Sequence, residues 1–557
     1  MKFLPSIAIA LSLLAASPIA AQEAPPAPPS PKLIVVISVD QFSADLFAEY
    51  RAQFRFGFAR LMQGAVFPSG YQSHSATETC PGHSTILTGD HPARTGIVAN
   101  DWIDLRVTRA DKTVYCVEDE TIPGTDSGNY TVSDKHLRVS TLGEWMKAAN
   151  PASRVVSVAG KDRAAIMMGG HRIDELWYWW DKSKQFVSYP GRTAPAPAAV
   201  AKINASLTQR LAEAQTPLDL PAFCKPRDRA IPVGGGKTVG DGRFARDAGA
   251  VGKFKASPEF DDSIVALAAG LVTELKLGQG SATDLIAIGA SATDYVGHAY
   301  GTEGTEMCLQ LFALDETLGR LFAVLDSTGV DYEVVLTADH GGHDLPERNQ
   351  QHAAPTAERI AAVAGDTGPV AALTAARVGA DVAQRLGLSG QILWGGSFGD
   401  MWIDPKLTKA QHDRVLAEAV KAFAADRQVA AVFTRAQIAA TPPASGPPET
   451  WTLIERARAS FDTERSGDFV VALKPRVTPI ADPVKGATAT HGSFWDYDRR
   501  VPILFWRKGM VGFEQPLSIE TVDIAPTLAA TIGLRVPVAI DGRCLDLDAG
   551  PGDSCAR

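Results

Sequence analysis

Basic residues are too few in this sequence for a general nucleic-acid-binding protein. The 557 residues include 54 Lys and Arg against 63 Asp and Glu, a formal net charge of -9. Nucleic-acid binding needs a basic footprint, so nucleic acid is not expected as a specific partner. An anionic substrate remains possible, because local charges and metals set the field at a site. Long apolar runs are also missing after the first 22 residues, which predicts no membrane partner.

The N-terminal segment predicts export. Residues 1–21 read as a secretory signal peptide, with one Lys, an apolar core and an Ala-rich end; a membrane anchor is the alternative. Residues 22–31 are Pro-rich and read as an extended tether. We therefore expect a periplasmic or secreted location, and we favour a monomer.

The cysteines lack any C-x-x-C spacing, which weakens a structural-zinc interpretation. In an exported chain they are candidates for disulfides instead. Six cysteines allow 15 pairings. Proximity in the sequence favours Cys80 with Cys116, and Cys544 with Cys555.

Short β-branched runs alternate with helical patterns, which indicates an α/β fold. The runs at 33–40, 154–163, 284–294 and 332–340 are mainly apolar and end in polar residues, so we expect a mostly parallel sheet with helices on both faces. We predict one catalytic domain over 32–549 and a tail over 550–557. The segments 172–260 and 344–490 are richer in Pro, Ala and Gly and read as insertions that cap the core.

Acidic and histidine residues stand where these predicted strands end, the edge at which α/β folds bind ligands. Asp294 and His298 are four apart, so one helical turn would put both on the same face. Carboxylates and imidazoles together suit zinc. The full candidate set is Asp40, Asp294, His298, Asp339, His340 and His491, although spacing alone does not place His491.

The stretch "TETCPGHST" at 77–85 offers a hydroxyl near a predicted helix start. Pro81 suits the first helical position, which would make Cys80 the cap and put Thr79 just before it. A hydroxyl there lies near unpaired N–H groups that favour phosphate, but it needs a base or a metal for activation. Thr79 as a simple helix cap is the alternative. A serine esterase centred on "GGSFG" at 395–399 is disfavoured, because no helix pattern follows.

Seven stretches together resemble the alkaline phosphatase superfamily. In order they are "VISVDQF", "ATETCPGHSTILTGDHPARTGIVANDW", "GKDR", "SATDYVGHAYG", "TADHGGH", "THGSFW" and "SIETVDIAPTLAATIGL". The chain is most similar to exported bacterial monoesterases with a threonine nucleophile, of the PafA and PhoK type. The resemblance implies two zinc ions and a nucleophilic Thr79 that becomes phosphorylated. It assigns Asp294, His298 and His491 to one zinc, and Asp40, Asp339, His340 and Thr79 to the other.

The same resemblance assigns phosphate binding to Asn100, Lys161 and Arg163. If "GKDR" is extended, Lys161 and Arg163 face the same side. Two cations suit a doubly charged phosphate monoester, and related phosphodiesterases lack this pair. The expected function is zinc-dependent hydrolysis of small phosphate monoesters. A phosphodiesterase or nucleotide pyrophosphatase on the same site, or a non-catalytic exported zinc- or phosphate-binding protein, remains the alternative. Calcium binding by surface carboxylates stays open.

Overall fold

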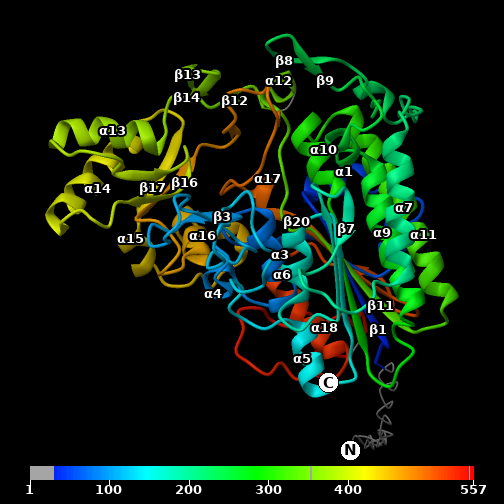
Figure 1. The fold of residues 1–557 in the computed structure, drawn as a ribbon. Helices are drawn as coiled ribbons and strands as arrows, with labels where there is room; N and C mark the ends of the chain where they lie inside the picture. The colour runs from blue at the N-terminus through cyan, green and yellow to red at the C-terminus, as the bar shows by residue number, and fades with distance from the viewer. Residues whose placement is uncertain (1–29, 352–353, 551, 557) are drawn as a thin grey trace, which may run out of the picture.

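The computed structural model describes residues 30–351, 354–550 and 552–556. The predicted signal peptide and nearly all of the predicted tether lie outside these residues. A ten-stranded sheet forms the centre of the molecule (Figure 1). From one edge to the other its strands are β21 (Phe513–Glu514), β2 (Ala65–Tyr71), β20 (Arg500–Arg507), β11 (Tyr332–Thr337), β1 (Leu33–Val39), β10 (Asp284–Ala290), β5 (Val155–Ala159), β6 (Glu175–Trp180) and β7 (Gln185–Val187), with β22 (Ile519–Glu520) beside β2.

The middle of the sheet is parallel. β1 pairs in parallel with β10 and β11, and β5 lies in parallel between β10 and β6. The β20 and β7 pairings are antiparallel. The four predicted strand runs coincide with β1, β5, β10 and β11, so the expected α/β fold with a mostly parallel sheet is confirmed.

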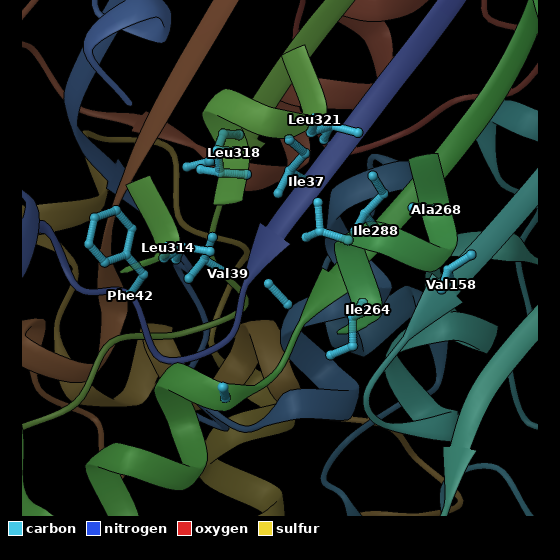
Figure 2. Close-up of a cluster of buried hydrophobic side chains, with 14 of the residues drawn as sticks. Ile37, Val39, Phe42, Val158, Ile264, Ala268, Ile288, Leu314, Leu318 and Leu321 are labelled. Atoms are coloured by element: carbon cyan, nitrogen blue, oxygen red, sulfur yellow. The ribbon is translucent and has the colours of Figure 1, made fainter. Parts of the chain in front are cut away.

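Strand β1 contributes to a hydrophobic core on each face of the sheet, because its side chains alternate. Ile37 and Val39 pack with Ile264 of α9 (Pro258–Glu274) and Leu318 of α11 (Thr305–Ser327), as Figure 2 shows. Val36 faces the opposite cluster, which includes residues of α3 (Thr79–Thr88), α5 (Leu142–Ala149) and α18 (Ile524–Thr531). Both faces are therefore covered by helices, which explains why every residue of the strand except Ser38 is apolar.

The second predicted insertion, 344–490, contains a separate four-stranded antiparallel sheet, which we call the cap sheet. Its strands are β15 (Leu393–Gly395), β16 (Gly399–Ile403), β18 (Phe469–Leu473) and β17 (Val429–Thr434), in that order. Helices α13 (Ala375–Leu386) and α14 (Lys409–Ala424) complete its own buried cluster. In Figure 1 this unit, in yellow, lies to one side of the central sheet. The "GGSFG" stretch is followed by β16 rather than by a helix.

The first predicted insertion, 172–260, continues the central sheet through β6 and β7 before it adds helices α7 (Ala198–Ala212) and α8 (Val251–Lys255). The structure pairs Cys80 with Cys116 and Cys544 with Cys555, as predicted from proximity. The remaining pair, Cys224 with Cys308, links the first insertion to α11. Among the described residues, no helix is long and apolar enough to cross a membrane.

Candidate functional site

The candidate site lies at the carboxyl ends of the parallel strands, where α/β folds bind ligands. Asp40 follows β1, and Asp339 and His340 follow β11. Asp294 and His298 lie on α10 (Ala292–Tyr300), directly after β10. His298 Nε2 is 3.2 Å from Asp294 Oδ1, so the two side chains lie on the same face of the helix, as expected.

His491 joins this cluster from a loop far along the chain. Its Nε2 lies 3.3 Å from Asp294 Oδ1, and its ring stacks on His340 with the ring centres 3.7 Å apart. Two groups of side chains have potential ligand atoms within 4.8 Å of one another: Asp294, His340 and His491, and Asp40, Asp339 and His340. His340 is thus within reach of both groups.

Several buried atoms of these groups have no hydrogen-bond partner among the residues that the structure describes. They are Asp40 Oδ1, Asp294 Oδ1, Asp339 Oδ2 and His340 Nε2. Burial and the neighbouring Asp294 raise the pKa of the Asp40 carboxyl well above its usual range. Buried polar atoms are normally satisfied, so a concentrated set of unsatisfied carboxylate and imidazole atoms fits bound metal cations.

The three histidines are oriented for metal ligation through Nε2. Their Nδ1 atoms donate to backbone carbonyls, His298 to Ala489 at 2.9 Å, His340 to Gly341 at 2.8 Å and His491 to Thr77 at 2.8 Å. A carbonyl only accepts, so each Nδ1 carries the proton and the Nε2 lone pair points into the site. Burial also lowers the pKa of His340 to about 3, which favours the neutral imidazole.

Thr79 is the first residue of helix α3, and Glu78 is the N-cap. The prediction that Cys80 caps this helix was therefore wrong. Pro81 occupies the third helical position, which it tolerates because the N–H groups of the first turn have no partner within the helix. Thr79 Oγ1 lies at the helix start, beside the metal-ligand groups.

Two cationic side chains converge on the Thr79 hydroxyl. Lys161 Nζ and Arg163 Nη2 each lie 3.3 Å from Thr79 Oγ1. The expectation of an extended segment here was wrong, since Lys161 is the N-cap of α6 (Asp162–Gly169) and Arg163 is in its first turn. Lys161 Nζ also lies 2.6 Å from Asp40 Oδ2 and 2.6 Å from Asp294 Oδ2. Although burial opposes its charge, these carboxylates raise the pKa of Lys161 above its usual value.

Asn100 is anchored beside the start of helix α3 by two hydrogen bonds. Its Oδ1 accepts from the Cys80 N–H at 2.8 Å, and its own N–H donates to Glu78 Oε2 at 2.7 Å. The Asn100 side-chain amide nitrogen is therefore the group left to donate to a substrate oxygen. Glu78 was not singled out from the sequence, although it directly precedes Thr79.

Other residues that hold the site residues in place were not identified from the sequence. Tyr115 O–H donates to Asp162 Oδ1 at 2.8 Å, and Arg163 Nη1 donates to the same Tyr115 oxygen at 3.2 Å. His83 Nδ1 lies 3.1 Å from Asp339 Oδ2 and 2.9 Å from the Thr79 carbonyl oxygen. The four-residue spacing of Thr79 and His83 on a helix was the signal that could have identified His83.

Comparisons with known proteins identify the family of the chain. A family model for type I phosphodiesterase / nucleotide pyrophosphatase matches residues 34–494. Alkaline phosphatase PhoK of Sphingomonas sp. is 57% identical over 531 residues, covering 94% of this chain and 93% of the relative. Alkaline phosphatase PhoD of Zymomonas mobilis is 49% identical over 535 residues, covering 94% of this chain and 89% of the relative.

A crystal structure of the alkaline phosphatase PafA has the same fold, with a TM-score of 0.79 and 24% identity, over 93% of this chain and 99% of that one. The resemblance noted from the sequence motifs is confirmed. The chain belongs to the type I phosphodiesterase / nucleotide pyrophosphatase family, within the alkaline phosphatase superfamily.

Proposed function

We propose that the chain is a zinc-dependent alkaline phosphatase that hydrolyses small phosphate monoesters through a phospho-threonine at Thr79. The observation that carries the proposal is the meeting of Lys161 and Arg163 at the Thr79 hydroxyl oxygen. A phosphoryl group next to Thr79 would meet both cations. The 57% identity to a phosphatase supports the same activity class.

The metal site would use the residues assigned from the sequence. Asp294, His298 and His491 would hold one zinc ion, and Asp40, Asp339, His340 and Thr79 the other. A zinc pair supplies Lewis-acid stabilisation of the attacking and leaving oxygens and lowers the pKa of bound hydroxyl groups and water. The unsatisfied carboxylate and imidazole atoms of these residues support this assignment.

The chain's own residues account for the transfer steps. The Thr79 hydroxyl loses its proton to solvent and its oxygen attacks phosphorus. The new O–P bond forms as the bond to the alcohol oxygen breaks, and the departing alkoxide takes up a proton from solvent. Water then cleaves the phospho-threonine, which releases inorganic phosphate and restores the hydroxyl. Arg163, Asn100 and Lys161 bind the non-bridging oxygens, where negative charge must be stabilised in the transition state.

Charge favours monoesters over diesters. A monoester brings a dianion to the two cations, whereas a diester brings one negative charge less. The family includes phosphodiesterases by name, so a diesterase on the same site is the competing enzyme function. A non-catalytic zinc- or phosphate-binding protein would have no use for a hydroxyl placed between metal ligands and cations.

The test compares kcat/KM for 4-nitrophenyl phosphate and methyl 4-nitrophenyl phosphate, using zinc-loaded protein at alkaline pH. We expect the monoester to be preferred by several orders of magnitude, and Thr79→Ala to abolish turnover with zinc still bound. Thr79→Ser, which keeps a hydroxyl, should retain activity. A preference for the diester would establish the phosphodiesterase instead, and phosphate binding without hydrolysis would establish the binding protein.

The location of this activity follows from the N-terminal segment of the sequence. We propose that the signal peptide directs the chain to the periplasm or the medium, where it releases phosphate from organic esters. Mass spectrometry of the N-terminus of the exported protein would test cleavage near Ala21. An intact N-terminus on membrane-bound protein would favour the anchor.

A further inference from the structure

A cavity of about 370 Å³ lies between the residues around Thr79 and the cap sheet. Its walls come from the central domain on one side and from β15, β16 and their connection on the other. Its lining includes three acidic residues and several aromatic ones, among them Glu78, Asp101, Asp400, Trp394, Phe398 and Phe494.

The cavity adjoins the proposed catalytic site at three points. Among its lining residues, Glu78 precedes Thr79, Asp101 follows Asn100, and Gly492 follows His491. Gly492 has a φ of +97°, and a Cβ there would lie 3.6 Å from Glu78 Cγ and 3.9 Å from Phe398 Cε2. Glu78 and the cap residue Phe398 therefore approach each other across the His491 loop. A group attached to a bound phosphate can reach the cavity along this loop.

The cavity carries an excess of acidic groups. Three carboxylates line it, from Glu78, Asp101 and Asp400, whereas none of its described lining residues is Lys, Arg or His. None of the three forms an ion pair within 4.0 Å among the residues that the structure describes, although the charge of Arg163 lowers the pKa of Glu78 and Asp101 against the effect of their burial, which raises it. Asp400 Oδ1 accepts from the Gly467 N–H at 2.6 Å. Burial raises the pKa of Asp400 to about 6, so this carboxylate is ionised at alkaline pH.

The positive charge that acts on the Asp400 carboxyl also binds backbone carbonyls. Arg435 lowers the pKa of Asp400 through its charge, but its guanidinium donates to the carbonyls of Thr463 and Ser466. An added cation in the cavity would therefore gain favourable electrostatic energy. Aromatic side chains of Trp394, Phe398 and Phe494 supply apolar surface and ring faces, which attract quaternary ammonium groups.

Building on the proposed function, we propose that this cavity binds the alcohol part of the substrate and favours phosphate monoesters of cationic alcohols, above all quaternary ammonium alcohols. Carboxylates would attract the positive charge, and aromatic faces would contact its methyl groups. Esters whose alcohol carries a negative charge would be disfavoured by the same carboxylates.

A second cavity, of about 210 Å³, is lined in part by the cationic pair itself. Its lining includes Lys161, Arg163, Asp181 and Lys182, so its charges are mixed. Asp181 Oδ2 already lies 2.6 Å from Lys255 Nζ. Asp181 therefore serves as a matched control. It is an acidic residue that lines a cavity beside Lys161 and Arg163, but its charge is already paired with Lys255.

The test uses two substrates of equal shape. Choline phosphate carries a quaternary ammonium group, and 3,3-dimethylbutyl phosphate has a neutral carbon in its place. For each protein the measured quantity is the ratio of kcat/KM for the charged substrate to that for the neutral one. The two alcohols differ in leaving-group reactivity, but this difference cancels when the ratio of a variant is divided by the wild-type ratio.

We expect Asp400→Asn to lower the ratio about fivefold, because one carboxylate charge is lost while the side-chain oxygen that binds Gly467 remains. Phe398→Leu should lower the ratio roughly threefold, because the ring face is lost. This variant provides the test if Asp400→Asn does not fold. Asp181→Asn should leave the ratio unchanged. A general loss of activity changes both substrates equally and does not move the ratio.

The inference is overturned if both substrates are hydrolysed and neither Asp400→Asn nor Phe398→Leu changes the ratio. It is also overturned if Asp181→Asn changes the ratio as much, which would place the alcohol in the second cavity. Those results leave the phosphatase activity intact. If wild-type enzyme hydrolyses neither substrate and no aryl monoester, the proposed function fails together with the inference.

Discussion

Lys161 Nζ and Arg163 Nη2 lie at the same distance, 3.3 Å, from the Thr79 hydroxyl oxygen, but they are held differently. Lys161 is within 2.6 Å of both Asp40 and Asp294, so its charge is largely compensated by these two carboxylates. Arg163 is held by the neutral Tyr115 hydroxyl. We therefore expect Arg163 to supply most of the uncompensated positive charge for a phosphate dianion.

Arg163→Gln tests this difference. Loss of one charged donor should lower kcat/KM for an aryl phosphate monoester by about 10²–10³. The loss for the matching diester should be smaller, roughly tenfold or less, because the diester carries one negative charge less. Arg106→Gln, which removes an exposed Arg paired with Asp104, is the matched control and should change neither value. Equal losses for both substrates would show that Arg163 does not select the dianion.

The sequence allowed prediction of the strand-end residues because each is close to a mainly apolar strand. Asp40, Asp294 and Asp339 could be placed at one edge of a parallel sheet for that reason alone. His491 could not, because a long inserted segment separates it from His340 and its position depends on the Nδ1 bond to the Thr77 carbonyl. That hydrogen bond joins residues 414 positions apart, so no local sequence pattern indicates it.

The cap sheet was also beyond prediction. Its strands are short, β15 with three residues and β16 with five, and its cluster relies on contacts between strands and helices spread over 360–477. Local periodicity is weak in such short strands, and the Pro- and Ala-rich composition suggested irregular structure. Helix α3 starts two residues earlier than predicted, since Pro81 fits the third helical position as well as the first.

Asp294→Asn tests the metal site directly. The side chain lies within 3.3 Å of the ligating nitrogens of His298 and His491, so loss of its charge should weaken one of the two zinc ions. We expect zinc content after dialysis, measured by plasma mass spectrometry, to fall from about two ions per chain to about one. Asp326→Asn changes a surface residue that pairs with Arg60. It is the control, and this variant should keep both zinc ions. Unchanged zinc content in Asp294→Asn would refute the assignment.

Gly82→Ala should damage the same site through the backbone. A Cβ at Gly82 would lie 1.9 Å from the Asp339 carbonyl oxygen, so α3 and the end of β11 must separate. Overpacking of this kind costs roughly 1–3 kcal/mol, and it displaces Asp339 and Thr79 relative to each other. We expect a lower Tm, less bound zinc and reduced kcat.

Gly252→Ala is the matched control for that change. Gly252 is a helical glycine in α8 with no atom within 4 Å of the added Cβ. This substitution should leave activity unchanged and stabilise by about 0.4–1 kcal/mol. The steric argument fails if Gly82→Ala keeps wild-type Tm and zinc content.

His91 should make stability depend on alkaline pH. Its Nε2 lies 3.1 Å from Glu520 Oε1 and its Nδ1 lies 3.1 Å from Asp541 Oδ2. Although burial opposes the charge, these carboxylates raise the pKa of His91 to about 10. The charged pair therefore stabilises the fold fully below pH ~6.5, and this contribution, on the order of 3 kcal/mol, is lost as pH rises through about 10. The Tm difference between wild type and His91→Gln should thus be largest near pH 6 and shrink by pH 10.5. Asp541→Asn should give the same trend, and a difference that stays constant over this range would contradict the role of His91.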